Sequence, residues 1–135
     1  MNKYGLKFHH IGLAVKNPNK TIIFTKNLGY EIADEVYDNL QRVYLRMCFH
    51  SEMPNIEIIY SDIPDSPIEK ILKYQKEKFY HICYTTNNLK LTIKTIKEVN
   101  HLITVSYPKP AILFNNNPVS FYYISGFGII EILEI

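Results

Sequence analysis

The stretch FHHIGLAVKNPNKTI, residues 8–22, is followed later in the chain by a close copy, FYHICYTTNNLKLTI, residues 79–93. The two stretches align without gaps at an offset of 79 − 8 = 71 residues. The identical aligned pairs are Phe8/Phe79, His10/His81, Ile11/Ile82, Asn17/Asn88, Thr21/Thr92 and Ile22/Ile93. A solenoid needs about three repeats, so two copies indicate a closed pair of modules related by a pseudo-twofold axis.

The first copy predicts a strand followed by a helix. Residues 8–15 are typical of a strand. Residues 16–29 are typical of a helix, because Asn17 can cap it, Pro18 suits its first turn and Gly29 can close it. Three further strands are expected, at residues 30–37, 42–49 and 55–61. The first half is therefore predicted to be β-α-β-β-β.

A connector follows, and the same order of elements then begins again. Residues 62–78 predict a short helix with Ser66 as its cap, Pro67 in its first turn and Glu69 as a capping-box carboxylate. The second half is predicted to have a strand at residues 79–86, a helix at 87–100 capped by Asn87 or Asn88, and strands near 102–105, 119–125 and 129–134. The apolar residues at helical spacing are Leu89, Ile93, Ile96 and Val99. Residues 106–118 are expected to be a loop, with a strand or a lid at residues 111–114.

The repeated histidines lie on the predicted first strands, where side chains alternate between two faces. His10 shares one face with Gly12 and Ala14. The other face of this strand is apolar, and we expect the helix to cover it. In the second copy, His81 shares the corresponding face with Cys83.

The last strand of each half carries a carboxylate among apolar residues: Glu57 in NIEIIY and Glu131 in GIIEILE. A buried carboxylate is costly unless it is paired or bound to a cation. Two imidazoles and two carboxylates brought together would suit a divalent first-row metal, with positions left for water or substrate. A single strand histidine is more often a core residue, and a glutamate in a last strand often faces solvent. The repetition of both at matching positions favours the metal site.

The other histidines and the cysteines are weaker candidates. His9 is expected to point to the opposite face of the strand from His10. His50 and His101 fall in predicted turns. Cys48 and Cys83 lie in predicted strands and form no CxxC motif. We therefore expect two free, buried thiols in a cytoplasmic protein.

The composition argues against several function classes. The net charge is only +2, and the modest lysine group at residues 70–78 is interpreted as the solvated face of a short helix. A nucleic-acid footprint would need a clustered basic face. No stretch approaches the ~20 apolar residues that span a membrane, and residues 1–10 lack the apolar core of a signal peptide. We expect neither nucleic acid nor membrane as a partner.

Two β-α-β-β-β modules, opened by HHIG-AV and HIC and closed by IIEILE, resemble the vicinal oxygen chelate superfamily. This superfamily includes glyoxalase I, methylmalonyl-CoA epimerase, extradiol dioxygenases, and the bleomycin and fosfomycin resistance proteins. The resemblance covers nearly the whole chain and is closest to the small glyoxalase and methylmalonyl-CoA epimerase branch. NIEIIYSDIPDSPIEKIL followed by YHIC looks like that branch's strand, DSPI linker and second histidine strand.

The resemblance implies an α+β fold in which two tandem modules form a cupped, mostly antiparallel sheet around a metal cleft. Residues 1–135 would form a single glyoxalase-like domain, with module one at residues 6–61, a linker at 62–77 and module two at 78–135. The resemblance also implies a homodimer.

By position, the resemblance implies that His10, Glu57, His81 and Glu131 bind a divalent metal ion (Ni, Co, Zn, Mn or Mg). Glu131 is also implied to be the catalytic base. The implied function is a metal-dependent isomerase that enolises an acyl thioester or hemithioacetal, similar to methylmalonyl-CoA epimerase. A glyoxalase I-like enzyme (lactoylglutathione lyase) is the alternative. The implied small-molecule partner is an acyl-CoA or a glutathione-type thiol adduct.

One position departs from the family's pattern. Some epimerases carry a second glutamate in the third strand, and our alignment places Leu45 there, between Tyr44 and Arg46. Two-base epimerisation needs such a partner, whereas a one-base proton shuttle needs only Glu131 and the metal.

Two further alternatives stay open on the same fold. One is a metal-free protein that binds or sequesters a small molecule in a cleft lined by tyrosines such as Tyr44, Tyr122 and Tyr123. Packing in the strand core is the commoner use of such residues. The other alternative is a metal-dependent oxygenase, which usually uses two histidines and one glutamate.

Overall fold

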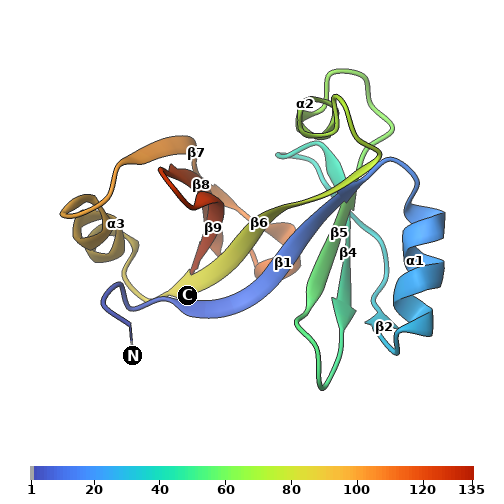
Figure 1. The fold of residues 1–135 in the computed structure, drawn as a ribbon, viewed down its shortest axis with the longest axis horizontal. Helices are drawn as coiled ribbons and strands as arrows, with labels where there is room; N and C mark the ends of the chain where they lie inside the picture. Colours follow the sequence, from blue (N-terminus) through green and yellow to red (C-terminus); the bar gives the residue numbers. More distant parts are fainter. Residues whose placement is uncertain (1) are drawn as a thin grey trace. The chain divides into compact units, whose positions relative to one another are not determined.

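The computed structural model describes residues 2–135 of the 135-residue chain (Figure 1). They divide into two compact units. The first unit consists of residues 10–80. The second unit consists of residues 81–135 together with the N-terminal segment that ends at His9. None of the helices in the described part is both long and apolar enough to cross a membrane.

The first unit holds the first repeat and the connector. Its elements are β1 (Lys7–Val15), which starts in the N-terminal segment, α1 (Pro18–Asn27), β2 (Glu31–Ile32), β3 (Val36–Asp38), β4 (Val43–Phe49), β5 (Ile56–Tyr60) and α2 (Pro67–Ile71). The strand order is β2-β4-β5-β1, with β3 paired to β4. β1 and β5 are parallel, and the other pairs are antiparallel.

The second unit holds the second repeat. Its elements are β6 (Glu77–Thr86), which starts in the first unit, α3 (Leu89–Lys97), β7 (Leu102–Pro110), the 3-10 turn η1 (Ile112–Phe114), β8 (Pro118–Ile124) and β9 (Gly128–Glu134). The strand order is β6-β9-β8-β7, with β6 and β9 parallel and the other pairs antiparallel. The described residues thus form a mixed, mostly antiparallel α+β fold in tandem modules, as predicted, with nine strands where eight were expected. The cupped arrangement around a cleft stays a prediction.

The prediction of one continuous strand at residues 30–37 is wrong, because the structure has two short strands, β2 and β3, in this range. Ala33 lies between them. Its backbone N–H donates to Met47 O at 2.8 Å, but its carbonyl accepts from the side chain of Arg46 at 2.9 Å. A side-chain donor therefore replaces a ladder bond and satisfies the backbone at the break.

β7 is longer than predicted, because it continues beyond residues 102–105 as far as Pro110. Its two prolines, Pro108 and Pro110, are tolerated because β7 is the last strand in its unit's order, where a missing N–H need not break the ladder. Two register shifts against β8 mark its irregular part. Residues 112–114 form the turn η1 instead of a strand.

The two longer helices begin at the asparagines that the repeats share. Asn17 Oδ1 accepts from Asn19 N at 3.2 Å, and Asn88 Oδ1 accepts from Leu91 N at 3.0 Å. The prediction of Asn17 as a cap is confirmed. Of the two candidates in the second repeat, Asn88 and not Asn87 is the cap.

The predicted capping box of α2 is only half present. Ser66 occupies the cap position, but its side chain makes no capping hydrogen bond. The carboxylate of Glu69 accepts from Asp65 N at 3.2 Å, one residue before the predicted partner. Ser66 is 1% exposed, so its side chain is buried instead of turning back to the helix end.

We expect Asn88→Ala to lower the free energy of unfolding by about 1 kcal/mol, because α3 loses the side-chain acceptor for its first amides. Asn17→Ala should have a similar effect on α1. Urea unfolding measures both. Asn87→Ala is the matched control, because Asn87 is exposed and lies outside the cap. Equal losses at Asn87 and Asn88 would contradict the cap assignment.

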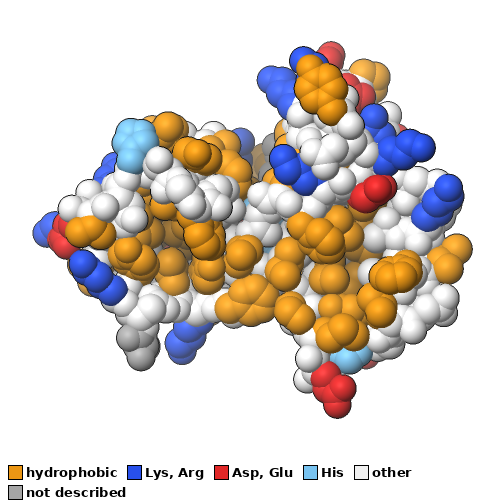
Figure 2. Space-filling model, in the orientation of Figure 1, with side chains coloured by type: hydrophobic (Ala, Val, Ile, Leu, Met, Phe, Trp, Pro, Cys, Tyr) orange, Lys and Arg blue, Asp and Glu red, His pale blue; other side chains and the backbone are white. Residues whose placement is uncertain are grey.

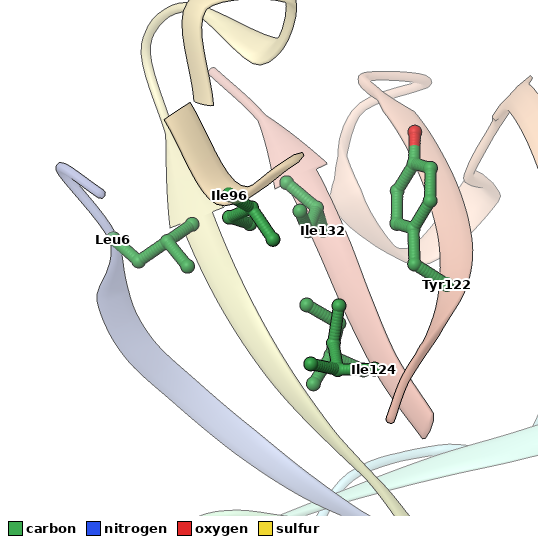
Figure 3. Close-up of a cluster of buried hydrophobic side chains, with 6 residues drawn as sticks. Leu6, Ile96, Tyr122, Ile124 and Ile132 are labelled. Carbon is green, nitrogen blue, oxygen red and sulfur yellow. The ribbon is translucent and has the colours of Figure 1, made fainter. Parts of the chain in front are cut away.

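Each repeat's helix covers one face of its sheet. In the second unit, Ile96 of α3 packs with residues of the N-terminal segment, β8 and β9 (Figure 3). This cluster consists of Leu6, Ile96, Tyr122, Ile124, Ile130 and Ile132. The first unit has a corresponding cluster of Leu13, Val15, Tyr30, Cys48, Ile56 and Ile58, with Ile22 of α1 against it. The expected helix-covered face of β1 is therefore confirmed.

The predicted apolar stripe of α3 is shorter than expected. Val99 is 64% exposed, because α3 ends at Lys97 and the chain turns before Val99 can reach the sheet. The lysines of residues 70–78 are all exposed. On the face shown in Figure 2, Lys and Arg side chains are scattered among apolar and neutral ones.

Candidate metal centre

The first unit places His10 beside Glu57. β1 and β5 pair in parallel with Gly12 opposite Glu57, so the carboxylate lies next to the strand position two residues after the histidine. His10 Nε2 and Glu57 Oε1 are 3.6 Å apart. Both residues are buried, at 0% and 3% exposed. The first unit thus contains a buried imidazole–carboxylate pair.

The second unit repeats this arrangement with His81 and Glu131. β6 and β9 pair in parallel with Cys83 opposite Glu131, again two residues after the histidine. His81 Nε2 and Glu131 Oε1 are 3.3 Å apart, and both residues are buried. Because the 71-residue offset maps Gly12 onto Cys83, the two pairs are built in the same register.

The local sequence explains why each pair forms. The first and last strands of each repeat are parallel neighbours, and alternation turns the His and Glu side chains to the face opposite the helix. Burying a carboxylate is costly unless a proton donor or a cation meets it. In each unit an imidazole nitrogen lies close to the buried carboxylate. The imidazole can act as the proton donor, or it can bind, together with the carboxylate, a metal cation that compensates the negative charge.

The structure therefore places all four predicted ligands, His10, Glu57, His81 and Glu131, on the predicted strands. It brings His10 to Glu57 within one unit and His81 to Glu131 within the other. That the two pairs share one metal ion remains a proposal.

The remaining histidines are not part of either His–Glu pair. His50 lies in a turn, as predicted, and its Nδ1 accepts from Glu52 N at 2.9 Å and from Met53 N at 3.1 Å. His101 is exposed between α3 and β7. His9 packs edge-on against Phe114, with ring centroids 5.2 Å apart.

Two of the three tyrosines proposed for a ligand cleft pack against other groups, whereas Tyr123 is 40% exposed. Tyr44 stacks on Tyr60, with ring centroids 5.6 Å apart, and also contacts Tyr37. Tyr122 belongs to the core cluster under α3. Its neighbour in sequence, Phe121, lies opposite Glu131 across β8 and β9, so strand alternation turns Tyr122 away from the His81–Glu131 pair.

A pair of cavities in the described part of the second unit lies on the side of its sheet that α3 covers. One, of about 450 Å³, is lined by residues that include Tyr4, Ile96 and Ile130. The other, of about 590 Å³, lies between α3 and β7 and is lined by residues that include Lys90 and Tyr107. Neither His81 nor Glu131 lines them, so these cavities are separate from the candidate metal ligands.

Cys48 and Cys83 are both buried thiols, as predicted. Burial raises the pKa of the Cys48 thiol from 9.0 to about 11, although the nearby Arg46 guanidinium opposes this shift. Buried thiols with raised pKa values are poor nucleophiles at neutral pH. Cys48 is therefore a structural residue.

We expect protein stability to fall between about pH 9 and pH 11, because the folded state holds the Cys48 proton more tightly than the unfolded state does. The stabilising contribution is complete below the unfolded pKa and is lost as the pH rises through the folded pKa. Its size is about 2–3 kcal/mol. Urea unfolding from pH 7 to 11 measures the loss. Cys48→Ala should make the curve shallower, and an unchanged curve would contradict this origin.

The same module occurs twice in the chain, and each copy has a buried His–Glu pair on its first and last strands. These features define a class of paired-module proteins that carry metal-ligating residue types in both halves. The model of the Glyoxalase/Bleomycin resistance protein/Dioxygenase superfamily matches residues 9–121. The chain belongs to this superfamily. Among curated protein sequences, none matches the chain significantly.

Solved structures with the same fold include methylmalonyl-CoA epimerases. The chain is 17% identical to the epimerase from Mycobacterium tuberculosis, with a TM-score of 0.76, over 94% of this chain and 86% of that one. The Streptomyces coelicolor epimerase in complex with 2-nitronate-propionyl-CoA is also 17% identical, with a TM-score of 0.75, over 95% and 96%. A hypothetical protein from Bacillus halodurans C-125 is 21% identical, with a TM-score of 0.81, over 96% and 94%. At these identities the likeness concerns the fold alone.

Proposed function

We propose that His10, Glu57, His81 and Glu131 bind one divalent metal ion and that the protein is a metal-dependent isomerase. The reaction would begin with removal of a proton next to the carbonyl of an acyl thioester. One observation carries this proposal: the buried His–Glu pair occurs twice, in the same strand register.

The chemistry of the four side chains suits a metal ion. Each offers one imidazole nitrogen or one carboxylate oxygen as a ligand atom. Nitrogen and oxygen donors of these types are suited to Zn, Co, Ni and Mn, and carboxylates also bind Mg. A cation between two buried carboxylates would compensate their desolvation, which neutral apolar neighbours cannot do.

Glu131 is proposed to be the base. A bound metal ion would polarise the substrate carbonyl and stabilise the negative charge that develops when the neighbouring C–H bond breaks. The Glu131 carboxylate takes that proton and later returns it to carbon, so the group is regenerated after each turnover. His81, 3.3 Å from Glu131 Oε1, would hold the carboxylate in place.

Methylmalonyl-CoA epimerase-like chemistry is the first candidate. The resemblance in the DSPI linker and the second histidine strand supports it. So do the neighbouring folds, among which a solved epimerase carries methylmalonyl-CoA. A thioester of coenzyme A is therefore the proposed substrate class, and a homodimer in the cytoplasm the proposed form of the protein.

Glyoxalase I-like chemistry is the second candidate, and Leu45 favours it. Leu45 is 5% exposed on β4 and pairs with Ile59, on the sheet face that Glu57 shares. An apolar side chain here cannot protonate the opposite face of a carbanion. A reaction that returns the proton to an adjacent carbon needs only one base, so Glu131 alone would suffice for a hemithioacetal substrate.

Proton exchange in heavy water separates these candidates. Metal-loaded protein is incubated with methylmalonyl-CoA or with the hemithioacetal of methylglyoxal and glutathione, and NMR follows the loss of the α-proton signal. We expect exchange with the thioester. Exchange only with the hemithioacetal would select the glyoxalase-like reaction. No exchange with either substrate would overturn the isomerase and favour a protein that only binds a small molecule.

A further inference from the structure

The two His–Glu pairs differ in the residue that faces each glutamate from the next strand. In the first unit, Met47 of β4 lies opposite Glu57. In the second unit, Phe121 of β8 lies opposite Glu131. The offsets agree, since 121 − 47 and 131 − 57 both equal 74. Met47 and Phe121 are therefore equivalent positions of the repeat that carry different side chains.

Phe121 reaches the histidine of its pair as well as the glutamate. The rings of His81 and Phe121 are 5.3 Å apart between centroids and meet at 82°, an edge-to-face contact. The strand order is β6-β9-β8, so the Phe121 side chain extends across β9, which carries Glu131, to touch a ring based on β6. Its ring thus contacts His81 from the strand position that pairs with Glu131.

The two side chains constrain their neighbours differently. Phenylalanine is a rigid ring with two rotatable bonds, and edge-to-face contacts between aromatic rings are worth about 0.5–1.5 kcal/mol beyond area burial. Methionine has three rotatable bonds and adapts to the space around it. Hydrogen-bonding groups that hold a metal-ligating histidine in one orientation typically change metal affinity by about 10- to 100-fold when removed. The worth of an edge-to-face contact corresponds to a change of up to about tenfold.

The geometry points to Phe121 as a positioning residue that fixes the orientation of His81 beside Glu131, whereas Met47 leaves the His10–Glu57 pair adaptable. This inference rests on the proposed function, because it assigns unequal roles to the two halves of the proposed metal site.

Co²⁺ is the probe for the test, because its visible absorption reports the arrangement of its ligands. Phe121→Leu removes the ring but remains apolar, and Met47→Leu is the matched control at the equivalent position, since Leu and Met have similar volumes. We expect Phe121→Leu to weaken Co²⁺ binding about tenfold and to shift the absorption bands. Met47→Leu should change the affinity less than about threefold, as expected for a volume-conserving swap. Phe121→Tyr keeps the ring and should restore wild-type binding.

A readout without metal keeps this inference separate from the proposed function. In the metal-free protein, the imidazole NMR signals of His81 should broaden in Phe121→Leu, because the ring then samples more than one orientation. The imidazole signals of His10 should keep their width in Met47→Leu. If wild-type protein binds no metal, the proposed function fails, while this comparison still tests the positioning role. Equal effects of Phe121→Leu and Met47→Leu, with or without Co²⁺, would overturn the inference.

Discussion

Glu131→Gln is expected to slow α-proton exchange by about 100- to 10,000-fold, the range that a general base supplies. The amide has nearly the same size and retains an oxygen that can bind a metal, but it cannot take a proton from carbon. The variant should therefore keep most of its metal and its fold while losing the reaction. NMR exchange rates at saturating substrate, on samples of measured metal content, provide the comparison.

Glu57→Gln is the matched control for this prediction. Glu57 holds the same place in the other repeat, opposite Gly12 where Glu131 is opposite Cys83. In the proposed site it is a ligand and not the base. We expect it to retain exchange to within about tenfold, well inside the loss that removal of a base causes. The reverse pattern, with exchange lost in Glu57→Gln and kept in Glu131→Gln, would transfer the role of base to Glu57.

His81→Ala and His10→Ala should each weaken metal binding by at least about 100-fold. Loss of a metal ligand should have a larger effect than loss of a group that only hydrogen-bonds to a ligand, which typically costs about 10- to 100-fold. Each substitution removes an imidazole and leaves a glutamate buried without its neighbouring nitrogen. The two histidines belong to different units, so loss of all tight metal binding on substitution of either one is a specific consequence of a shared ion. Calorimetric titration with Zn²⁺ or Co²⁺ gives both affinities.

His101→Ala serves as the control, since His101 is exposed between α3 and β7. It should bind metal like the wild type. Thermal unfolding of the metal-free variants checks that they remain folded. Wild-type affinity in either His10→Ala or His81→Ala would remove that histidine from the ligand set.

Much of the fold was predictable because the same capping residues and the same strand alternation occur in both repeats. Asn17 and Asn88 cap both helices, and the alternation around His10 and His81 separates the helix-covered face from the other. Where the prediction was wrong, long-range or edge effects decided the structure. Two prolines are compatible with β7 because it is an edge strand, and the break after β2 depends on a side chain from β4.

The candidate site was predictable in its residue types but not in its register. Strand alternation predicts which residues share a sheet face with Glu57 and with Glu131. The positions of these glutamates beside His10 and His81 depend on parallel strand pairing, which no local sequence pattern specifies. Phe121 was not identified from the sequence. The repeat offset is 71 at the histidines and 74 at the glutamates, so the equivalence of Phe121 with Met47 emerges only when the last strands are aligned separately.

The stoichiometry of metal binding tests the central claim most directly. Metal-free protein is titrated with Zn²⁺, and native mass spectrometry counts the ions bound per chain in the wild type, His10→Ala and His81→Ala. We expect one tightly bound ion per chain, lost in both variants. Two ions per chain, one lost in each variant, would mean that the His–Glu pairs act as separate sites. No ion in the wild type would contradict the metal centre itself.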